Sequence, residues 1–174
     1  MTWFAPLLRE FQTTSHRSFA IVAASMLDEL LRKLISAHLV PPSAGETLLD
    51  GPHAPLGSFS SRIDAAYRLG FISSRLARDL HLVRKIRNEF AHTFEDIGFD
   101  TAAIEQRVKE LAESNKISQR NPSIDPSLAS STAGQFLIGT SWIASFLTAY
   151  LEDDVEPFRE AEIEWGYTTT IFER

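Results

Sequence analysis

Apolar residues recur at helical spacing in residues 15–39, and this is the clearest pattern in the chain. Phe19, Ala23, Met26, Leu27, Leu30 and Leu34 follow the repeat, and charged residues fall between them. A period near 3.6 residues predicts an amphipathic helix with one buried face. Thr14 or Ser15 can cap the start of this helix, and the Pro-containing segment 40–45 ends it.

The same kind of pattern predicts further helices downstream. A short helix starts at Ser58 or Ser60, runs through Tyr67 and ends at Gly70. The others cover Ser73 to about Thr93, residues 101–114 and residues 133–153. Valine and isoleucine do not alternate with polar residues over any run, so little or no sheet is expected. The sequence therefore predicts an all-α helical bundle, with an irregular Gly/Pro-rich loop over residues 45–60 and a polar loop over residues 115–131.

Length and composition predict one globular domain over residues 1–174, in which 44% of residues are hydrophobic and 23% are charged. The chain has no cysteine, and its five histidines show no ligand spacing with acidic residues. We therefore expect no metal site and no cofactor. The N-terminal sequence lacks the basic and apolar regions of a signal peptide, and no apolar run approaches the roughly 20 residues of a membrane span. A cytoplasmic location, without membrane contact, is expected.

Charge is unevenly distributed along the chain. The formal net charge of −6 argues against a general nucleic-acid-coating role. Between Arg75 and His92, however, five arginine or lysine residues stand against two acidic ones, while the tail over residues 155–174 is acidic. The basic segment can bind a phosphate backbone locally, or it can dock against the acidic end of the chain. Composition leaves both readings open.

The stretch KIRNEFAHT, residues 85–93, contains an arginine at an apolar position. On a helix, Leu76, Leu80, Val83, Ile86, Phe90 and Phe94 share one sector, and Arg87 falls inside it. Asn88 and His92 lie on the opposite side, flanked by Arg84. A guanidinium on an apolar face is costly unless a charged partner meets it.

Two readings of Arg87 follow from that cost. In the first, Arg87 forms a buried ion pair with Asp28, Glu29 or Asp64, and Asn88 and His92 are surface or capping residues. In the second, Arg87 and His92 lie near a helix end that can unwind, where two copies of the helix meet across a dimer axis.

The segment 85–93 also carries a family resemblance. RNEFAH is similar to the R-x4-H pattern of HEPN domains, small α-helical bundles that often dimerise. Residues 48–92, which include LLDG, PLG and the R-x4-H, closely resemble the signature of the mannitol operon repressor family, and the likeness covers about residues 15–95. The resemblance implies a HEPN-like fold, a homodimer and a transcriptional repressor of a sugar-alcohol uptake operon.

The HEPN resemblance also implies an alternative, which is metal-independent RNA cleavage. His92 would then act as general acid or base on the ribose 2′-hydroxyl, since the imidazole titrates near neutrality. Arg87 would hold the scissile phosphate, and Asn88 would orient the histidine or donate to the phosphate. A non-catalytic HEPN interaction module is a third possibility.

Direct DNA reading by residues 65–80 is disfavoured. They superficially obey a helix-turn-helix pattern around Gly70, but Asp79 occupies a position that this motif keeps apolar, and the second helix is too long. The Gly70 turn is better read as a link between antiparallel bundle helices. A repressor without its own DNA reader would act through protein contacts.

Candidate binding residues are Asp50, Gly51, Arg84 and Arg87. Asp50 either caps or turns the 45–60 loop, with Gly51 and Gly57 supplying backbone freedom, or it belongs to a partner surface formed by that loop. Farther along the chain, Trp142, Phe146 and Tyr150 stand at helical spacing. We expect these three aromatic residues to lie in the core or at a dimer seam.

Overall fold

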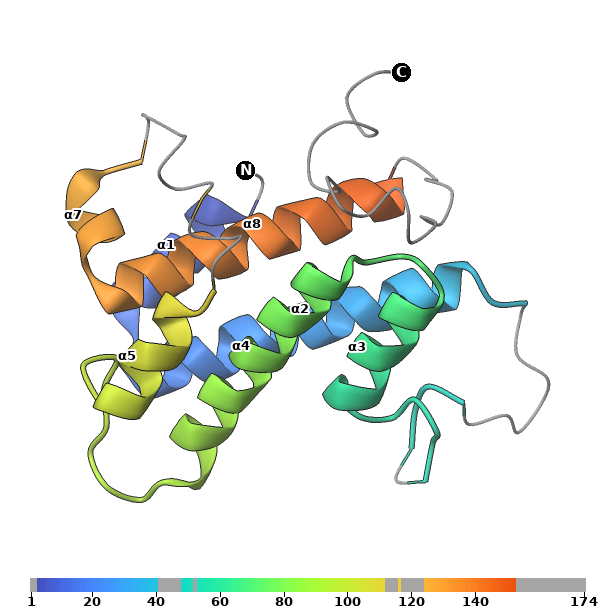
Figure 1. The fold of residues 1–174 in the computed structure, drawn as a ribbon, viewed down its shortest axis with the longest axis horizontal. Helices are drawn as coiled ribbons and strands as arrows, with labels where there is room; N and C mark the ends of the chain where they lie inside the picture. Colours follow the sequence, from blue (N-terminus) through green and yellow to red (C-terminus); the bar gives the residue numbers. More distant parts are fainter. Residues whose placement is uncertain (1–2, 41–47, 52, 112–115, 117–123, 153–174) are drawn as a thin grey trace.

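The computed structural model describes residues 3–40, 48–51, 53–111, 116 and 124–152, and the elements found there are helices (Figure 1). They are α1 (Phe4–Thr13), α2 (His16–Ala37), α3 (Phe59–Arg68), α4 (Ser74–His92), α5 (Ala102–Lys109), α7 (Pro126–Ser130) and α8 (Thr132–Glu152). No strand occurs in the described ranges, so the predicted all-α fold is confirmed.

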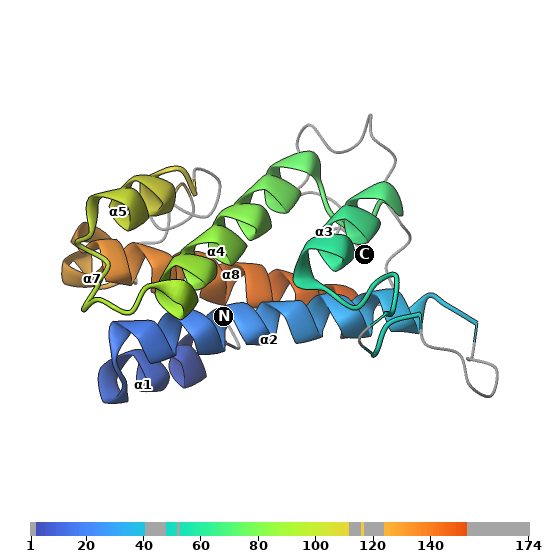
Figure 2. The same cartoon turned by 90° about the horizontal axis from the view of Figure 1, so that it is seen from below.

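The helices pack in two layers around α2. In Figure 2, α2 and α8 lie along one side of the molecule, and α5, α4 and α3 form a row that crosses above them. Helix α2 contacts α8, α4 and α3, and α5 contacts both α4 and α8. Because α4 is the middle helix of the row, its outward side is bordered by α3 on one flank and by α5 on the other.

An aromatic cluster fills the space between the two layers. Phe99, from the turn between α4 and α5, is 1% exposed, and its ring lies 5.1 Å from Phe90, 5.1 Å from Phe136 and 6.2 Å from Phe19, centroid to centroid. These rings come from α4, α8 and α2. One turn residue therefore joins three helices of the core.

Serine side chains cap the starts of α2, α3 and α4, and each of these serines is among the start residues predicted from the sequence. The side chain of Ser15 accepts from the Ser18 amide at the start of α2, and that of Ser73 accepts from Leu76 at the start of α4. At α3, Ser58 rather than Ser60 is the cap, and it forms a reciprocal capping box with Ser61. Gly70 has φ 79°, the left-handed conformation that lets the chain turn sharply between α3 and α4.

Two short helices were not anticipated from the sequence. Helix α1 packs on α8 and α2 and buries Leu7, and Trp3, the residue before it, donates a hydrogen bond from Nε1 to Thr148 Oγ1 at 2.6 Å. The prediction of an extended loop over residues 115–131 is wrong for Pro126–Ser130, which form α7 behind an Asp125 cap. Proline at the first helical position and an aspartate before it are ordinary start signals of a helix. The signals were therefore present, but the Pro/Ser-rich composition of the stretch led to the prediction of a loop.

Of the three aromatic residues predicted on α8, Phe146 and Tyr150 belong to the core, and Trp142 is half-buried and packs against it. Tyr150 is fully buried, Phe146 is 8% exposed, and the ring of Trp142 stacks on that of Phe146 at 5.7 Å. The core reading of these residues is thus confirmed, while a dimer seam stays a prediction. The acidic tail over residues 155–174 lies outside the described residues. None of the described helices combines the length and the apolar character that a membrane crossing requires.

Candidate functional site

The residues of the R-x4-H pattern lie along the second half of α4. Arg87 and Asn88 are half-buried, and the Arg87 guanidinium donates from Nη1 to Asn88 Oδ1 at 3.0 Å. His92 is exposed and is the last residue of the helix. Phe94 is 104% exposed, so the prediction that it joins the buried sector is wrong. The helix ends before it, because Thr93 has an extended backbone conformation.

The buried ion pair that was predicted for Arg87 is made by another arginine. Asp28 Oδ1 lies 2.8 Å from Nη1 of Arg62, which is 7% exposed, and none of the three proposed carboxylates pairs with Arg87 in the described structure. On α3, Arg62 stands three residues after Phe59 and four before Ala66, both of which are buried. That spacing was the available signal, because it places the guanidinium on the apolar face.

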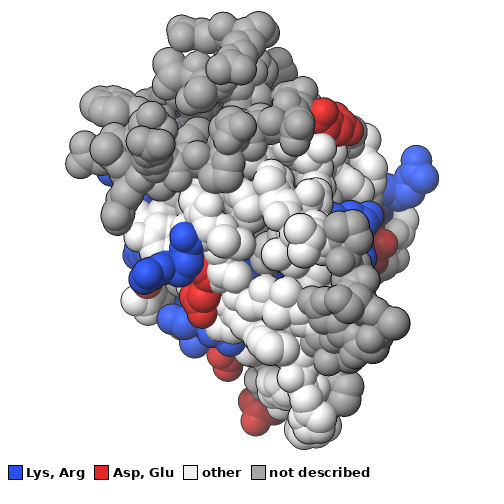
Figure 3. All heavy atoms as spheres, turned by 90° about the vertical axis from the view of Figure 1, so that its right-hand side faces the viewer, with Lys and Arg blue, Asp and Glu red and all other residues white. Residues whose placement is uncertain are grey.

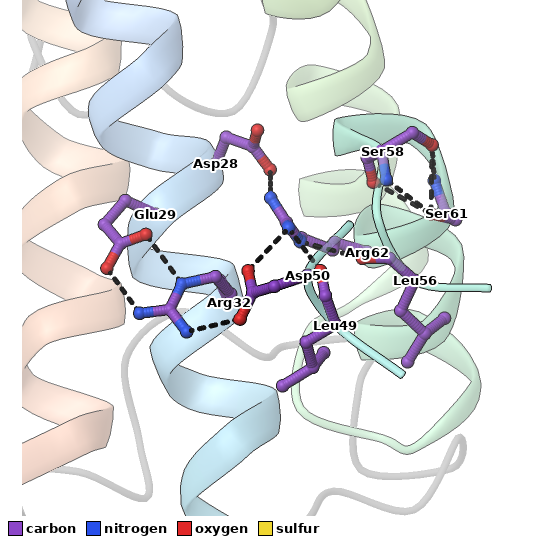
Figure 4. Close-up of polar contacts among 9 residues, drawn as sticks. All are labelled: Asp28, Glu29, Arg32, Leu49, Asp50, Leu56, Ser58, Ser61 and Arg62. Atoms are coloured by element: carbon purple, nitrogen blue, oxygen red, sulfur yellow. Dashed lines mark hydrogen bonds and ion pairs between the residues drawn. The ribbon is translucent and has the colours of Figure 1, made fainter. Parts of the chain in front are cut away.

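Arg62 also holds residues 48–51 and 53–57, which we call the segment 48–57, against the bundle (Figure 4). Its Nε donates to the Leu56 carbonyl at 2.9 Å, and its Nη2 donates to the Leu49 carbonyl at 2.8 Å. Asp50 lies near two arginines, with Oδ1 3.8 Å from Nη2 of Arg62 and Oδ2 3.4 Å from Nη1 of Arg32. Gly51 has φ 119°, which a residue with a side chain rarely adopts. Asp50 and Gly51 therefore shape this segment, and its use as a partner surface stays a prediction.

A second ion pair extends this cluster along α2. Arg32 donates to both oxygens of Glu29, at 2.8 and 2.9 Å. The hydrogen bond from Arg32 lowers the pKa of Glu29 below its ordinary value of 4.5, and the positive charge of Arg32 adds to the effect. Stability from this pair is present above the ordinary pKa and is lost as the pH falls through the lowered one. The Glu29 side chain is 45% exposed, so the contribution is small.

The C-terminal end of α4 is held by Arg17, near the start of α2. Its Nη1 donates to the carbonyls of Phe90 and Thr93 at 2.6 and 2.8 Å, and its Nη2 donates to that of Glu95 at 2.9 Å. The last carbonyls of a helix have no partner within the helix, so a guanidinium is a strong cap for them. The last turn of α4 is intact, in contrast to the unwound end that the dimer reading considered.

A groove follows the outward side of α4 from Ser74 to Lys85, between α3 and Glu110, the residue after α5. Its volume is about 470 Å³, and Arg78, His81, Arg84 and Lys85 line it from α4. We call it the α4 groove. On one rim His81 Nε2 lies 3.0 Å from Asp64 Oδ1, and on the other Arg78 Nη2 lies 3.4 Å from Glu110 Oε2.

The structure thus separates the predicted binding residues into two groups. Arg84 and Arg87 lie on α4, and Asp50 and Gly51 lie in the segment anchored by Arg62. His81, Lys85 and Arg62 were not among the predicted site residues. In the described ranges, no group of three histidine or carboxylate side chains is arranged to hold a metal ion.

The α3–α4 pair does not have the features of a DNA-reading motif. Asp79 is 2% exposed, and α4 is 19 residues long and packs against α2, α3 and α5. A recognition helix is usually shorter, and its motif keeps the position of Asp79 apolar.

Two solved structures share this arrangement of helices. A chain in the X-ray structure of the MtlR–HPr complex from Escherichia coli is 22% identical, with a TM-score of 0.66, and the match covers 85% of this chain and 99% of that one. A possible transcriptional regulator, YggD from Shigella flexneri, is 18% identical, with a TM-score of 0.59, and the match covers 87% of this chain and 98% of that one. At such identities the likeness establishes the all-α fold of these proteins.

A family model described as the mannitol repressor, MtlR, matches residues 8–136. The chain belongs to the mannitol repressor family, a family of transcriptional regulators. The match begins before residue 15 and continues past residue 95, so it extends the predicted family core from α1 into α8. No curated protein gives a significant match. The predicted family is confirmed, while the HEPN-like detail and the homodimer stay predictions.

Proposed function

We propose that this protein regulates transcription through protein contacts in the cytoplasm, without reading DNA itself, and that an HPr protein is one of its partners. Family membership and the fold shared with a chain of the MtlR–HPr complex are the observations that carry the proposal. The net charge of −6 and the buried Asp79 on α4 support the absence of direct DNA reading. On the face shown in Figure 3, charged side chains of both signs lie side by side at the edges, and uncharged ones occupy most of the middle. Among the described side chains on that face, the positive charges do not form a continuous track for a phosphate backbone.

Titration calorimetry with purified HPr from the same organism tests the partner, and electrophoretic mobility of promoter DNA tests direct reading. We expect saturable binding of HPr, and no retardation of DNA by the protein alone at physiological salt. Sequence-specific retardation by the protein alone would contradict the indirect mode. The absence of binding heat would contradict HPr as the partner. It would not bear on direct DNA reading, which the mobility experiment tests.

A homodimeric ribonuclease is the second candidate function. It is favoured by the placement of Arg87, Asn88 and His92 on the last two turns of α4, with His92 exposed. Two protomers that met along this half of α4 would bring two such sets together around one RNA phosphate. Arg87 would stabilise the phosphate charge, and His92 would transfer the proton.

Light scattering combined with labelled RNA tests this candidate. A ribonuclease dimer should show twice the chain mass and should cleave RNA, with a loss of at least about 100-fold in His92→Ala. His53→Ala, which removes an exposed histidine outside α4, is the control and should cleave normally. Cleavage that survives His92→Ala would reject the assigned catalyst, and a monomer would reject the paired site.

A further inference from the structure

The charges that line the α4 groove are only partly compensated. Asp64 and Glu110, at the two rims, are already engaged by His81 and Arg78. Arg84 and Lys85, adjacent on α4, have no ion pair in the described part of the chain. Two neighbouring positive charges are thus left unmatched between two rims whose carboxylates are in use.

A second, independent observation indicates that the Arg84 side chain lacks a hydrogen-bond acceptor. Its Nε is buried and has no hydrogen-bond partner in the described structure. The guanidinium groups of Arg17, Arg32 and Arg62 each donate to two or more acceptors. A buried N–H without an acceptor is costly, and such groups in native proteins call for a specific explanation. An acceptor that comes from outside the protein explains this one.

We propose that the α4 groove is a binding site for a small molecule that bears a phosphate group, whose oxygens accept from Arg84 and Lys85. A phosphate monoester carries close to two negative charges at neutral pH, which matches the two unmatched cations. The fork of a guanidinium suits phosphate oxygens, and a small swing of the Arg84 side chain presents Nε together with Nη.

The dimensions and lining of the groove suit a compact organic phosphate. Its volume of about 470 Å³ lies within the range of small-molecule sites. Ala77 and Leu82 also line it and offer apolar contact for the organic part of the ligand. A nucleic-acid backbone is a poorer occupant, because Asp64 and Glu110 at the rims would oppose a row of phosphates. This site goes beyond regulation through protein contacts and does not depend on it.

Nuclear magnetic resonance of the isotope-labelled full chain tests the site, with inorganic phosphate as the probe and sodium chloride at equal ionic strength as the reference. We expect a saturable shift of the Arg84 Nε–H signal and of the α4 amides from Ser74 to Lys85. Lys85→Gln and Arg84→Gln should each weaken phosphate binding about tenfold, since each removes one charge-assisted contact. Lys85 is exposed, so its variant keeps the test open if Arg84→Gln fails to fold.

Arg9→Gln is the matched control, because it removes one exposed positive charge from α1, away from the groove. It should leave phosphate affinity within about twofold, since distant surface charges are screened by salt. Three results would overturn the proposal. The first is the lack of a saturable effect of phosphate on the spectrum, and the second is an equal loss of phosphate affinity in Arg9→Gln. The third is binding of acetate as tight as that of phosphate at matched ionic strength, which would make the groove a carboxylate site.

Discussion

Arg62→Ala is expected to lower the free energy of unfolding by about 3 kcal/mol, because removing one partner of a buried ion pair leaves the charge of the other buried without compensation. Asp28 would lose its ion pair at 2.8 Å, and the Leu49 and Leu56 carbonyls would lose their donors. The segment 48–57 would lose its anchor with them. Urea unfolding monitored by circular dichroism gives the energy, and hydrogen exchange should show faster exchange at the Leu56 amide, which donates to the Leu48 carbonyl.

Arg32→Ala is the matched control for this loss. Arg32 contacts Glu29 and Asp50 in the same cluster, but its side chain is 29% exposed, whereas that of Arg62 is 9% exposed. Exposed pairs contribute little, so the control should lose less than about 1 kcal/mol. If the two variants were equally stable, burial would not be what makes the Arg62 pair important.

Phe99→Ala is expected to destabilise the protein by about 4 kcal/mol, because it removes the buried apolar surface of the ring and leaves a cavity in its place. The ring touches Phe90, Phe136 and Phe19, so the cavity would open between α4, α8 and α2. Rings on three helices cannot all move inward to close it. Thermal and urea unfolding should agree on the loss.

The same turn region supplies a control of the same residue type. Phe94 is 104% exposed, so Phe94→Ala should change stability by no more than about 0.5 kcal/mol. A loss in Phe94→Ala comparable with that in Phe99→Ala would mean that Phe94 is covered in solution, as by a second copy of the chain.

Much of the fold follows from local signals in the sequence. The apolar repeats and the serine caps gave α2 and α4 to within a residue or two, because both signals act within a few residues of the helix they define. Helix α1 was missed because it is held by contacts that are distant in sequence, such as the bond from Trp3 to Thr148 on α8. Helix α7 was missed because it has only five residues, and its start signals stand in a Pro/Ser-rich stretch.

The site was predicted less well, and Arg87 and Arg62 show why. Both arginines fall on the apolar side of a helix, but a helical projection does not say which part of that side a neighbour covers. The structure covers Arg62 with α2 and the segment 48–57, and leaves Arg87 half-exposed beside Asn88. The α4 groove could not be predicted at all, because its rims bring distant parts of the chain together. Asp64 is 17 positions from His81 along the chain, and Glu110 is 32 positions from Arg78.

Arg17 holds the turn after α4 through hydrogen bonds to backbone carbonyls alone. None of the side chains of Thr93, Phe94 and Glu95 takes part in those three bonds, so evolution can exchange them without disturbing the path of the polypeptide. Substitutions at these three positions would therefore change the surface at this corner of the molecule while Arg17 keeps the backbone in place.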